Sequence, residues 1–266
     1  MSRGTTHRRG CTLRRWTHVA GHHLHSVETP AAAGPGRPTV VLLHGAVVTH
    51  RYFLPLLQAL STRDPTLPVA ALELPGVGAS SRGREPRDIA GQAELVTAWL
   101  RATGRTPAML VGSSMGAQTA VEVAVREPTL VESLVLIGPT VDASDRTLSG
   151  QFVKLLVDGT VESPAQLVIT STDLFRSNPR AMVRYLRASL DQRIEERLAA
   201  VTAPVLLIRG EFDPLVPRRW LRRLHRVTPD ARILELPDAA HCPHERRPDE
   251  VAQVIDRMRS HRPSTG

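Results

Sequence analysis

Residues 112–116 read Gly-Ser-Ser-Met-Gly and place Ser114 midway between two glycines. A short apolar run at residues 108–111 precedes this G-x-S-x-G pattern, and an alanine-rich, helix-compatible stretch follows it. A chain that turns from strand to helix within one residue strains that residue and crowds the backbone two positions away, where only glycine fits. The pattern therefore predicts a sharp corner that presents the Ser114 hydroxyl.

The chemistry expected at this corner is nucleophilic attack by Ser114. The backbone N–H of Met115 would lie in the first turn of the following helix, whose dipole favours a developing negative charge. The corner would then supply a nucleophile and half of an oxyanion hole. Ser113 falls outside the glycine spacing, and we expect a structural role for it. Ordinary glycine-rich turns also contain this pentapeptide, so its context decides between the two interpretations.

The elements around the corner alternate between strand and helix. Apolar runs predict strands at residues 39–43, 67–74, 107–111, 134–138, 203–209 and 233–236. Segments whose apolar residues recur at helical spacing predict helices at 51–60, 89–101 and 115–126. Such alternation predicts an α/β fold, a doubly wound and mostly parallel sheet with helices on both faces. Ligands bind such sheets at the carboxyl ends of the strands, where Gly45, Gly76 and Ser114 fall.

Three motifs follow successive predicted strands in a fixed order. They are His44-Gly45, the turn Pro75-Gly76-Val77-Gly78-Ala79-Ser80, and the G-x-S-x-G corner. In this combination the chain resembles the α/β-hydrolase superfamily over about residues 13–260. Glu73 departs from the pattern, because the family more often has aspartate there, and we expect little consequence.

The resemblance implies a catalytic triad and a second oxyanion donor. The family has an acid after a later strand and a histidine after the last one, which implies Asp213 and His241 here, with Ala46 as the second N–H donor. His241 would take the proton of Ser114, and Asp213 would orient the imidazole. Asp142 remains an alternative acid, since some family members place it there, and Glu211 is expected at the surface.

The resemblance also implies a helical cap inserted at residues 140–198, between core segments 13–139 and 199–260. Helices are predicted at 151–161, 164–176 and 178–201. Candidates for lining a substrate pocket are Phe152, Leu156, Phe175, Met182 and Tyr185. Alternatively, these side chains form the apolar face with which their helices pack on the core. The arginines at 176, 180, 184 and 187 are expected on a solvated helix face, with contact to an anionic substrate as the alternative.

The remaining histidines and the N-terminus are expected to be structural or exposed. Residues 1–12 predict a disordered basic arm, and residues 13–20 and 22–29 an edge hairpin around Gly21. His22, His23 and His25 lie on this hairpin without a nearby acid or cysteine, so we expect exposed histidines and no metal site. His44 is expected to support the oxyanion loop, while His50 and His244 are expected to be bystanders, His244 in solvent.

Composition narrows the classes of partner. The chain has 266 residues, 41% of them hydrophobic, and a net charge of +8, but 33 of its 34 basic residues are scattered arginines and only Lys154 is a lysine. We therefore expect no nucleic-acid partner, and the lack of a long apolar run predicts no membrane partner. Cys11 and Cys242 form no metal or disulfide spacing, which favours a cytoplasmic protein.

The sequence thus predicts a carboxylesterase-like serine hydrolase (EC 3.1.1) that cleaves an ester or related acyl bond of a small, largely apolar substrate without a cofactor. A serine in place of aspartate at position 114 argues against haloalkane and epoxide hydrolysis. Alternatives on the same fold are hydrolysis of a carbon–carbon bond, a lyase or perhydrolase reaction, or a small-molecule receptor without turnover. The substrate and the oligomeric state are not predicted.

Overall fold

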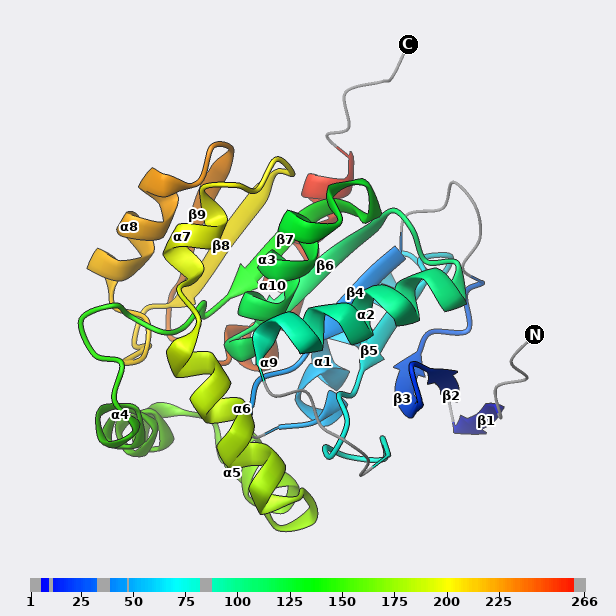
Figure 1. Cartoon of the computed structure of the whole chain (residues 1–266), viewed down its shortest axis with the longest axis horizontal. Helices are drawn as coiled ribbons and strands as arrows, with labels where there is room; N and C mark the ends of the chain where they lie inside the picture. Colours follow the sequence, from blue (N-terminus) through cyan, green and yellow to red (C-terminus); the bar gives the residue numbers. More distant parts are fainter. Residues whose placement is uncertain (1–5, 10–11, 33–38, 47, 82–87, 261–266) are drawn as a thin grey trace.

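A computed structural model describes residues 6–9, 12–32, 39–46, 48–81 and 88–260. Within these residues nine strands form one sheet in the order β1-β2-β3-β5-β4-β6-β7-β8-β9 (Figure 1). The strands are β1 (Thr6–Arg9), β2 (Thr12–Val19), β3 (His22–Glu28), β4 (Thr39–Leu43), β5 (Val69–Leu72), β6 (Ala108–Ser113), β7 (Val131–Ile137), β8 (Val205–Gly210) and β9 (Ala231–Leu236). Strands β4 to β9 are parallel, and β1 to β3 continue the sheet in antiparallel pairing.

Helices cover both faces of the sheet, as the alternating pattern predicts. They are η1 (His50–Phe53), α1 (Leu54–Arg63), α2 (Ile89–Thr103), α3 (Met115–Arg126), η2 (Pro128–Leu130), α4 (Leu148–Val161), α5 (Pro164–Arg176), α6 (Pro179–Asp191), α7 (Ile194–Leu198), α8 (Arg218–Val227), α9 (Pro243–Arg246) and α10 (Pro248–Ser260). Helices α2, α3, α7 and α8 lie in front of the sheet in Figure 1, and α1, α9 and α10 lie behind it. None of the helices in the described ranges is long and apolar enough to cross a membrane.

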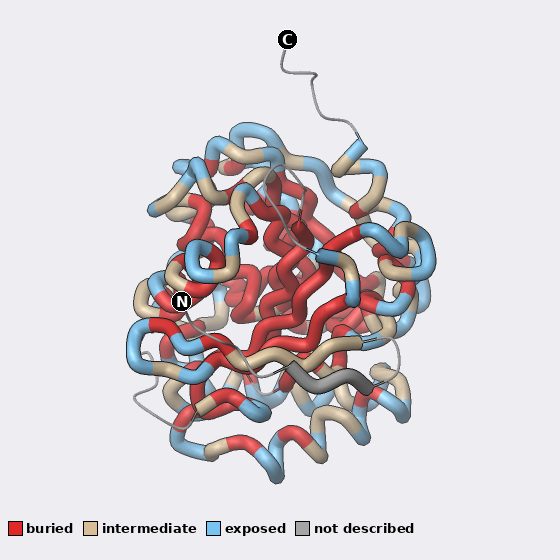
Figure 2. Tube along the Cα trace, turned by 90° about the vertical axis from the view of Figure 1, so that its right-hand side faces the viewer, coloured by how far each residue is buried: buried red, intermediate tan, exposed pale blue. Residues whose placement is uncertain are grey.

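The central strands divide their side chains between two hydrophobic cores. In β4, Val41 and Leu43 join the core with α2 and α3, whereas Val40 and Leu42 join the core with α1 and α10. Successive side chains of a strand point to opposite faces, so a strand buried on both faces needs an uninterrupted apolar run. The fully buried strands form the centre of the molecule in Figure 2.

The N-terminal edge differs in part from the sequence prediction. The hairpin of β2 and β3 is confirmed, with Val19 paired to His22 around the turn at Gly21. The prediction of a disordered arm over residues 1–12 is wrong for Thr6–Arg9, which pair antiparallel with β2 as an additional edge strand. Residues 1–5 and 10–11 lie outside the described residues.

The segment predicted as a cap lies between β7 and β8 and contains helices α4 to α7. The single helix predicted at 178–201 is wrong: the chain forms α6 and α7, separated at Gln192, where the backbone becomes extended. Leucine and isoleucine continue at four-residue spacing across this break, so periodicity could not reveal it. Ile194 and Leu198 of α7 are fully buried in the core between α3 and α8, which makes α7 part of the core.

Candidate active site

The corner at Ser114 has the strained geometry that its glycine spacing predicts. Ser114 has φ 55° and ψ −120°, an uncommon conformation for a residue with a side chain, and lies directly between β6 and α3. A Cβ atom at Gly112 would overlap the Gly116 backbone, and one at Gly116 would overlap the Leu43 carbonyl. The two glycines therefore permit the close approach of α3 to the sheet that lifts the serine above its edge.

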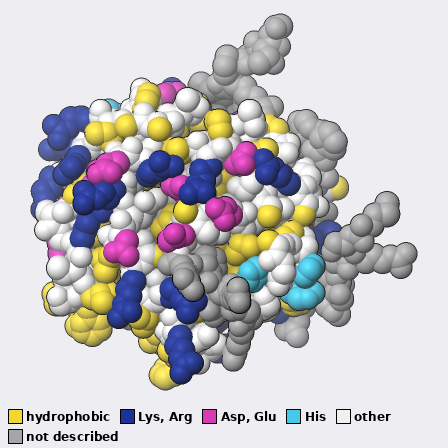
Figure 3. All heavy atoms as spheres, viewed as in Figure 1, with side chains coloured by type: hydrophobic (Ala, Val, Ile, Leu, Met, Phe, Trp, Pro, Cys, Tyr) yellow, Lys and Arg dark blue, Asp and Glu magenta, His cyan; other side chains and the backbone are white. Residues whose placement is uncertain are grey.

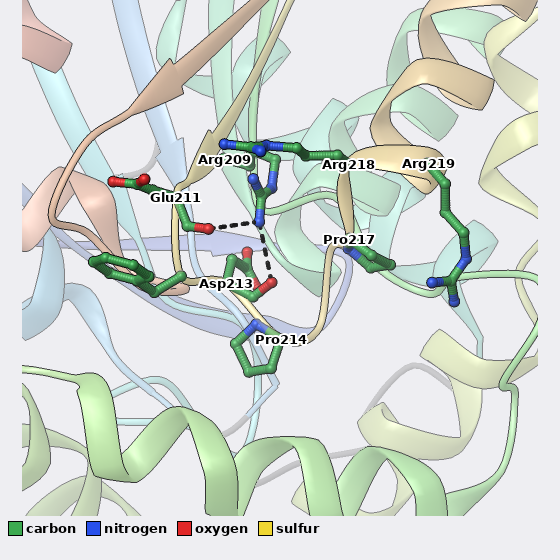
Figure 4. Close-up of a pocket in the computed structure, with 8 residues that line it drawn as sticks. Arg209, Glu211, Asp213, Pro214, Pro217, Arg218 and Arg219 are labelled. Carbon is green, nitrogen blue, oxygen red and sulfur yellow. Dashed lines mark hydrogen bonds between the residues drawn. The ribbon is translucent and has the colours of Figure 1, made fainter.

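The turn after β8 holds a buried carboxylate in a fixed orientation. Oδ1 of Asp213 accepts hydrogen bonds from the backbone N–H groups of Leu215 (2.8 Å) and Val216 (3.0 Å). From inside the turn, the Arg209 guanidinium donates to the carbonyl oxygens of Glu211 and Asp213, at 3.1 and 3.3 Å (Figure 4). These contacts leave Oδ2 of Asp213 free to face the next loop.

The loop after β9 brings His241 to that oxygen. Nδ1 of His241 lies 2.9 Å from Oδ2 of Asp213, and both side chains are buried. The ring packs over Gly138, where an added Cβ would lie 2.7 Å from the ring's Cε1. Since an ionised carboxylate only accepts hydrogen bonds, Nδ1 carries the proton, and Nε2 is left as the basic nitrogen when the imidazole is neutral.

Ser114 and His241 flank the same end of β7. The Ser114 N–H donates to the Ile137 carbonyl at 2.9 Å, and the imidazole lies against the next residue, Gly138. The Ser114 hydroxyl pairs with the Thr140 hydroxyl at 3.3 Å, whereas Nε2 of His241 is buried with no hydrogen-bond partner among the described residues. The structure thus brings the three predicted side chains to one edge of the sheet without a hydrogen bond between Ser114 and His241.

The His241 imidazole lies in a negatively charged environment. Burial acts to lower the pKa of His241, but the charge and hydrogen bond of Asp213, with the charges of Asp158 and Glu162, outweigh burial and raise this pKa to about 9. Burial, with repulsion by Glu162 and Asp213, raises the pKa of Asp158 to about 7. The protonated imidazole is therefore strongly stabilised here.

Two acidic side chains from the segment between β7 and β8 hold the His241 loop through its backbone. Oδ1 of Asp158, on α4, accepts the N–H of His241 at 3.1 Å, and Oε1 of Glu162 accepts the N–H of Cys242 at 2.7 Å. Sequence analysis missed both residues, because carboxylates on a helix with exposed apolar neighbours carry no motif. Their only signal was that they are the two acids of residues 148–162 and lie four positions apart.

The loop after β4 passes beside the serine. A Cβ at Gly45 would lie 3.4 Å from the Ser114 Cβ, so the backbone of this loop runs next to Ser114. His44 stabilises this loop as predicted: its Nε2 accepts the Leu74 N–H at 3.0 Å, which leaves Nδ1 to donate to the Gly45 carbonyl at 2.7 Å. Burial lowers the pKa of His44, which keeps this tautomer neutral.

A third carboxylate from the segment between β7 and β8, that of Asp173 on α5, holds the far end of that loop. Its Oδ2 accepts the N–H and the hydroxyl of Thr49, at 2.9 and 2.7 Å, and its Oδ1 pairs with Arg51 at 3.0 Å. The segment between β7 and β8 is therefore hydrogen-bonded to the loop after β4 and to the loop after β9.

Comparisons with known proteins agree with this architecture. The sequence profile described as "Alpha/beta hydrolase family" matches residues 40–254, from β4 to α10. The chain is a member of the alpha/beta hydrolase family.

Similar proteins include named hydrolases and esterases. The chain is 27% identical to 2-(acetamidomethylene)succinate hydrolase of Mesorhizobium japonicum, over 82% of this chain and 86% of that protein. It is 29% identical to the pimeloyl-[acyl-carrier protein] methyl ester esterase of Neisseria meningitidis serogroup C, over 77% of this chain and 86% of that protein. The crystal structure of E-2-(acetamidomethylene)succinate hydrolase has the same fold, with a TM-score of 0.79 at 23% identity, covering 94% of this chain and 99% of the other.

The pocket candidates of this alpha/beta hydrolase separate into two groups. Met182 and Tyr185 are buried, and the Tyr185 hydroxyl donates to the Pro75 carbonyl at 2.6 Å. Phe152, Leu156 and Phe175 are exposed on the outer surface, with 62%, 58% and 89% of their area accessible. The latter three therefore line no enclosed pocket in this structure.

Asp142, the alternative acid, and His244 make other contacts than the sequence suggested. Oδ2 of Asp142 pairs with Arg219 at 2.9 Å, so Asp213 is the acid that contacts His241. The expectation that His244 is solvated is wrong: it is fully buried against the rings of Tyr52 and Phe53, and burial lowers its pKa to about 3.

Glu73 has a larger role than the sequence suggested. His25, which we expected to be exposed, is fully buried, and its Nδ1 lies 2.8 Å from Oε2 of Glu73; Nδ1 of His50 lies 2.5 Å from Oε1. The three donor groups lie within 4.8 Å of one another and could hold a metal ion. The backbone N–H groups of His50 and Ala79 also donate to the carboxylate, so hydrogen bonds alone account for the cluster.

Proposed function

We propose that this alpha/beta hydrolase cleaves an ester or a related acyl bond of a small, largely apolar molecule through an acyl-enzyme on Ser114. The observation that supports this most is the pairing of His241 with Asp213, which leaves a basic Nε2 beside the strained serine corner. The named esterase among the relatives supports the reaction class.

The reaction begins when the Ser114 hydroxyl rotates from Thr140 toward Nε2 of His241. The imidazole accepts the hydroxyl proton as the oxygen attacks the acyl carbon, and it returns this proton to the leaving alcohol. Asp213 stabilises the imidazolium formed in between. In the second step, His241 takes a proton from a water molecule as the water oxygen attacks the acyl carbon. The imidazole then gives this proton to the Ser114 oxygen as the bond to the acyl group breaks and the acid leaves.

The oxyanion formed in each step would be bound by the N–H groups of Met115 and Ala46. Met115 is the first residue of α3, and its N–H has no partner inside the helix. Ala46 follows Gly45, whose backbone runs beside Ser114. Each such donor is worth about 3 kcal/mol of transition-state stabilisation.

Turnover of a p-nitrophenyl ester series tests the proposal. Ser114→Ala should lower kcat by about 10⁴-fold or more, whereas the neighbouring Ser113→Ala should retain activity. A fluorophosphonate should label Ser114, as mass spectrometry of the digested protein would show. Labelling at another residue, or full activity in Ser114→Ala, contradicts the proposed nucleophile.

The relative named for 2-(acetamidomethylene)succinate favours a second candidate, hydrolysis of a substrate other than an ester on the same three residues. Offering that compound alongside the ester series separates the two candidates. Tight ligand binding without any turnover would instead indicate a receptor.

A further inference from the structure

Helices α4 and α5 of the cap turn their polar side chains toward the protein. The buried residues of α4 are Gln151 and Asp158, and those of α5 are Gln166 and Asp173. Both aspartates bind core loops, at His241 and at Thr49. The buried positions of these helices are thus polar, beside Leu155 and Ile169, which are half-buried against the core; an ordinary surface helix buries an apolar stripe instead.

Their outward side is correspondingly hydrophobic. Among the described residues, fourteen large hydrophobic side chains are exposed; six lie on α4 and four on α5, ten in all. The most exposed are Phe175 (89%), Val168 (63%) and Phe152 (62%). We call this surface the α4–α5 face. An apolar surface of this kind is rare on a monomer and indicates a binding partner.

Between residues 148 and 187, the charged side chains that are exposed are all arginines. The acids between residues 148 and 187 are Asp158, Glu162 and Asp173, and the carboxylates of all three bind core loops. Arg176, Arg180 and Arg187 remain exposed. In the space-filling view, hydrophobic side chains at the lower left, over the cap helices of Figure 1, are bordered by lysine and arginine side chains (Figure 3).

We propose that the α4–α5 face binds the surface of an anionic lipid bilayer. The two helices would lie in the plane of the interface, with phenylalanine, leucine and valine among the acyl chains and the arginines at the phosphate groups. A second copy of the chain fits less well, because a two-fold contact through this face would bring the same arginines together. An anionic surface satisfies both the apolar and the cationic groups.

Such binding needs no membrane-spanning segment. The expectation of no membrane partner rested on the lack of a long apolar run, and a run of that kind is required only for crossing the bilayer. The apolar residues of the α4–α5 face are instead spread over two helices of 14 and 13 residues.

Co-sedimentation of the full chain with vesicles tests the proposal. Vesicles of phosphatidylcholine with about 30% phosphatidylglycerol should bind the protein, and phosphatidylcholine alone should bind it at least about tenfold more weakly. The double variant Phe152→Ser, Val168→Ser should lose about tenfold or more in affinity for the anionic vesicles. Both side chains are exposed, so thermal unfolding followed by circular dichroism should be unchanged.

Two further variants test whether vesicle binding depends on the α4–α5 face itself and on its arginines. Ile233→Ser removes another exposed hydrophobic side chain, on β9 and away from the face, and should bind vesicles as the unmodified chain does. Arg176→Glu with Arg180→Glu should abolish the preference for phosphatidylglycerol. The proposal fails if the chain does not bind anionic vesicles, if Ile233→Ser weakens binding equally, or if sedimentation velocity shows a dimer that Phe152→Ser dissociates.

Discussion

Replacing Asp158 by asparagine should make the enzyme more active at neutral pH. Asp158 contacts the His241 backbone at 3.1 Å, and its charge is one of those that raise the pKa of His241 to about 9. Above its own pKa of about 7 the Asp158 carboxyl is ionised, in the range where His241 titrates. Asparagine keeps an oxygen that can accept the His241 N–H but removes the charge.

The size of the effect follows from Coulomb's law. For a carboxylate within about 6 Å of an imidazolium, an effective dielectric constant of about 20 gives a stabilisation on the order of 3 kcal/mol, an upper bound of about 2 pKa units. A shift of about one unit, from 9 to 8, raises the neutral fraction of His241 at pH 7 from about 1% to about 10%. We therefore expect kcat/KM at pH 7 to rise about tenfold, with little change above pH 10.

The assay is the pH profile of kcat/KM for the best p-nitrophenyl ester from pH 6 to 10. The control is Asp256→Asn on α10, which removes a carboxylate that pairs with Arg63 at the surface. Its profile should match that of the unmodified enzyme. A midpoint that stays in place or moves to higher pH in Asp158→Asn would refute the electrostatic argument, and an equal shift in Asp256→Asn would show a general effect of net charge.

Three further predictions concern stability, measured by urea unfolding. Gly116→Ala should cost about 2 kcal/mol or more, because the added methyl group overlaps the Leu43 carbonyl. Glu73→Gln should cost about 3 kcal/mol at pH 7; because its two histidine partners hold the pKa of Glu73 well below 4.5, the difference should shrink as the pH falls below about 4.5. Burial lowers the pKa of His244 from 6.5 to about 3, so the folded state loses about 2 kcal/mol from this group between pH 7.5 and 5. His244→Phe should remove that loss, and an unchanged pH dependence would contradict the burial of a neutral imidazole.

The sequence predicted the parts of the fold that repeat a local pattern. The strand at Thr39–Leu43 and the helices Met115–Arg126 and Pro164–Arg176 match the prediction to the residue, because continuous apolar runs and proline or glycine boundaries mark them. The corner at Ser114 was predictable because its backbone conformation requires glycine on both sides.

What the sequence could not predict depends on contacts between distant segments. Asp158 and Asp173 act on loops 83 and 124 residues away in the chain, and no spacing rule joins them. The Glu73 cluster likewise unites β3, η1 and the turn after β5, so His25 could not be distinguished from an exposed edge histidine. The outward orientation of Phe152 and Phe175 was also hidden, since helical spacing does not say which side of a helix meets the core.

The bonds from α4 and α5 to the loops on either side of Ser114 also limit how new specificity can arise in this protein. Asp158, Glu162 and Asp173 hold the loops that carry His241 and Thr49, although all three lie in the segment between β7 and β8 that would be exchanged to accommodate another substrate. A chimera in which this segment comes from another protein would need equivalent acids at these three positions to keep its reaction rate. Changes confined to the outward-facing residues between them leave the hydrogen bonds of the three acids intact.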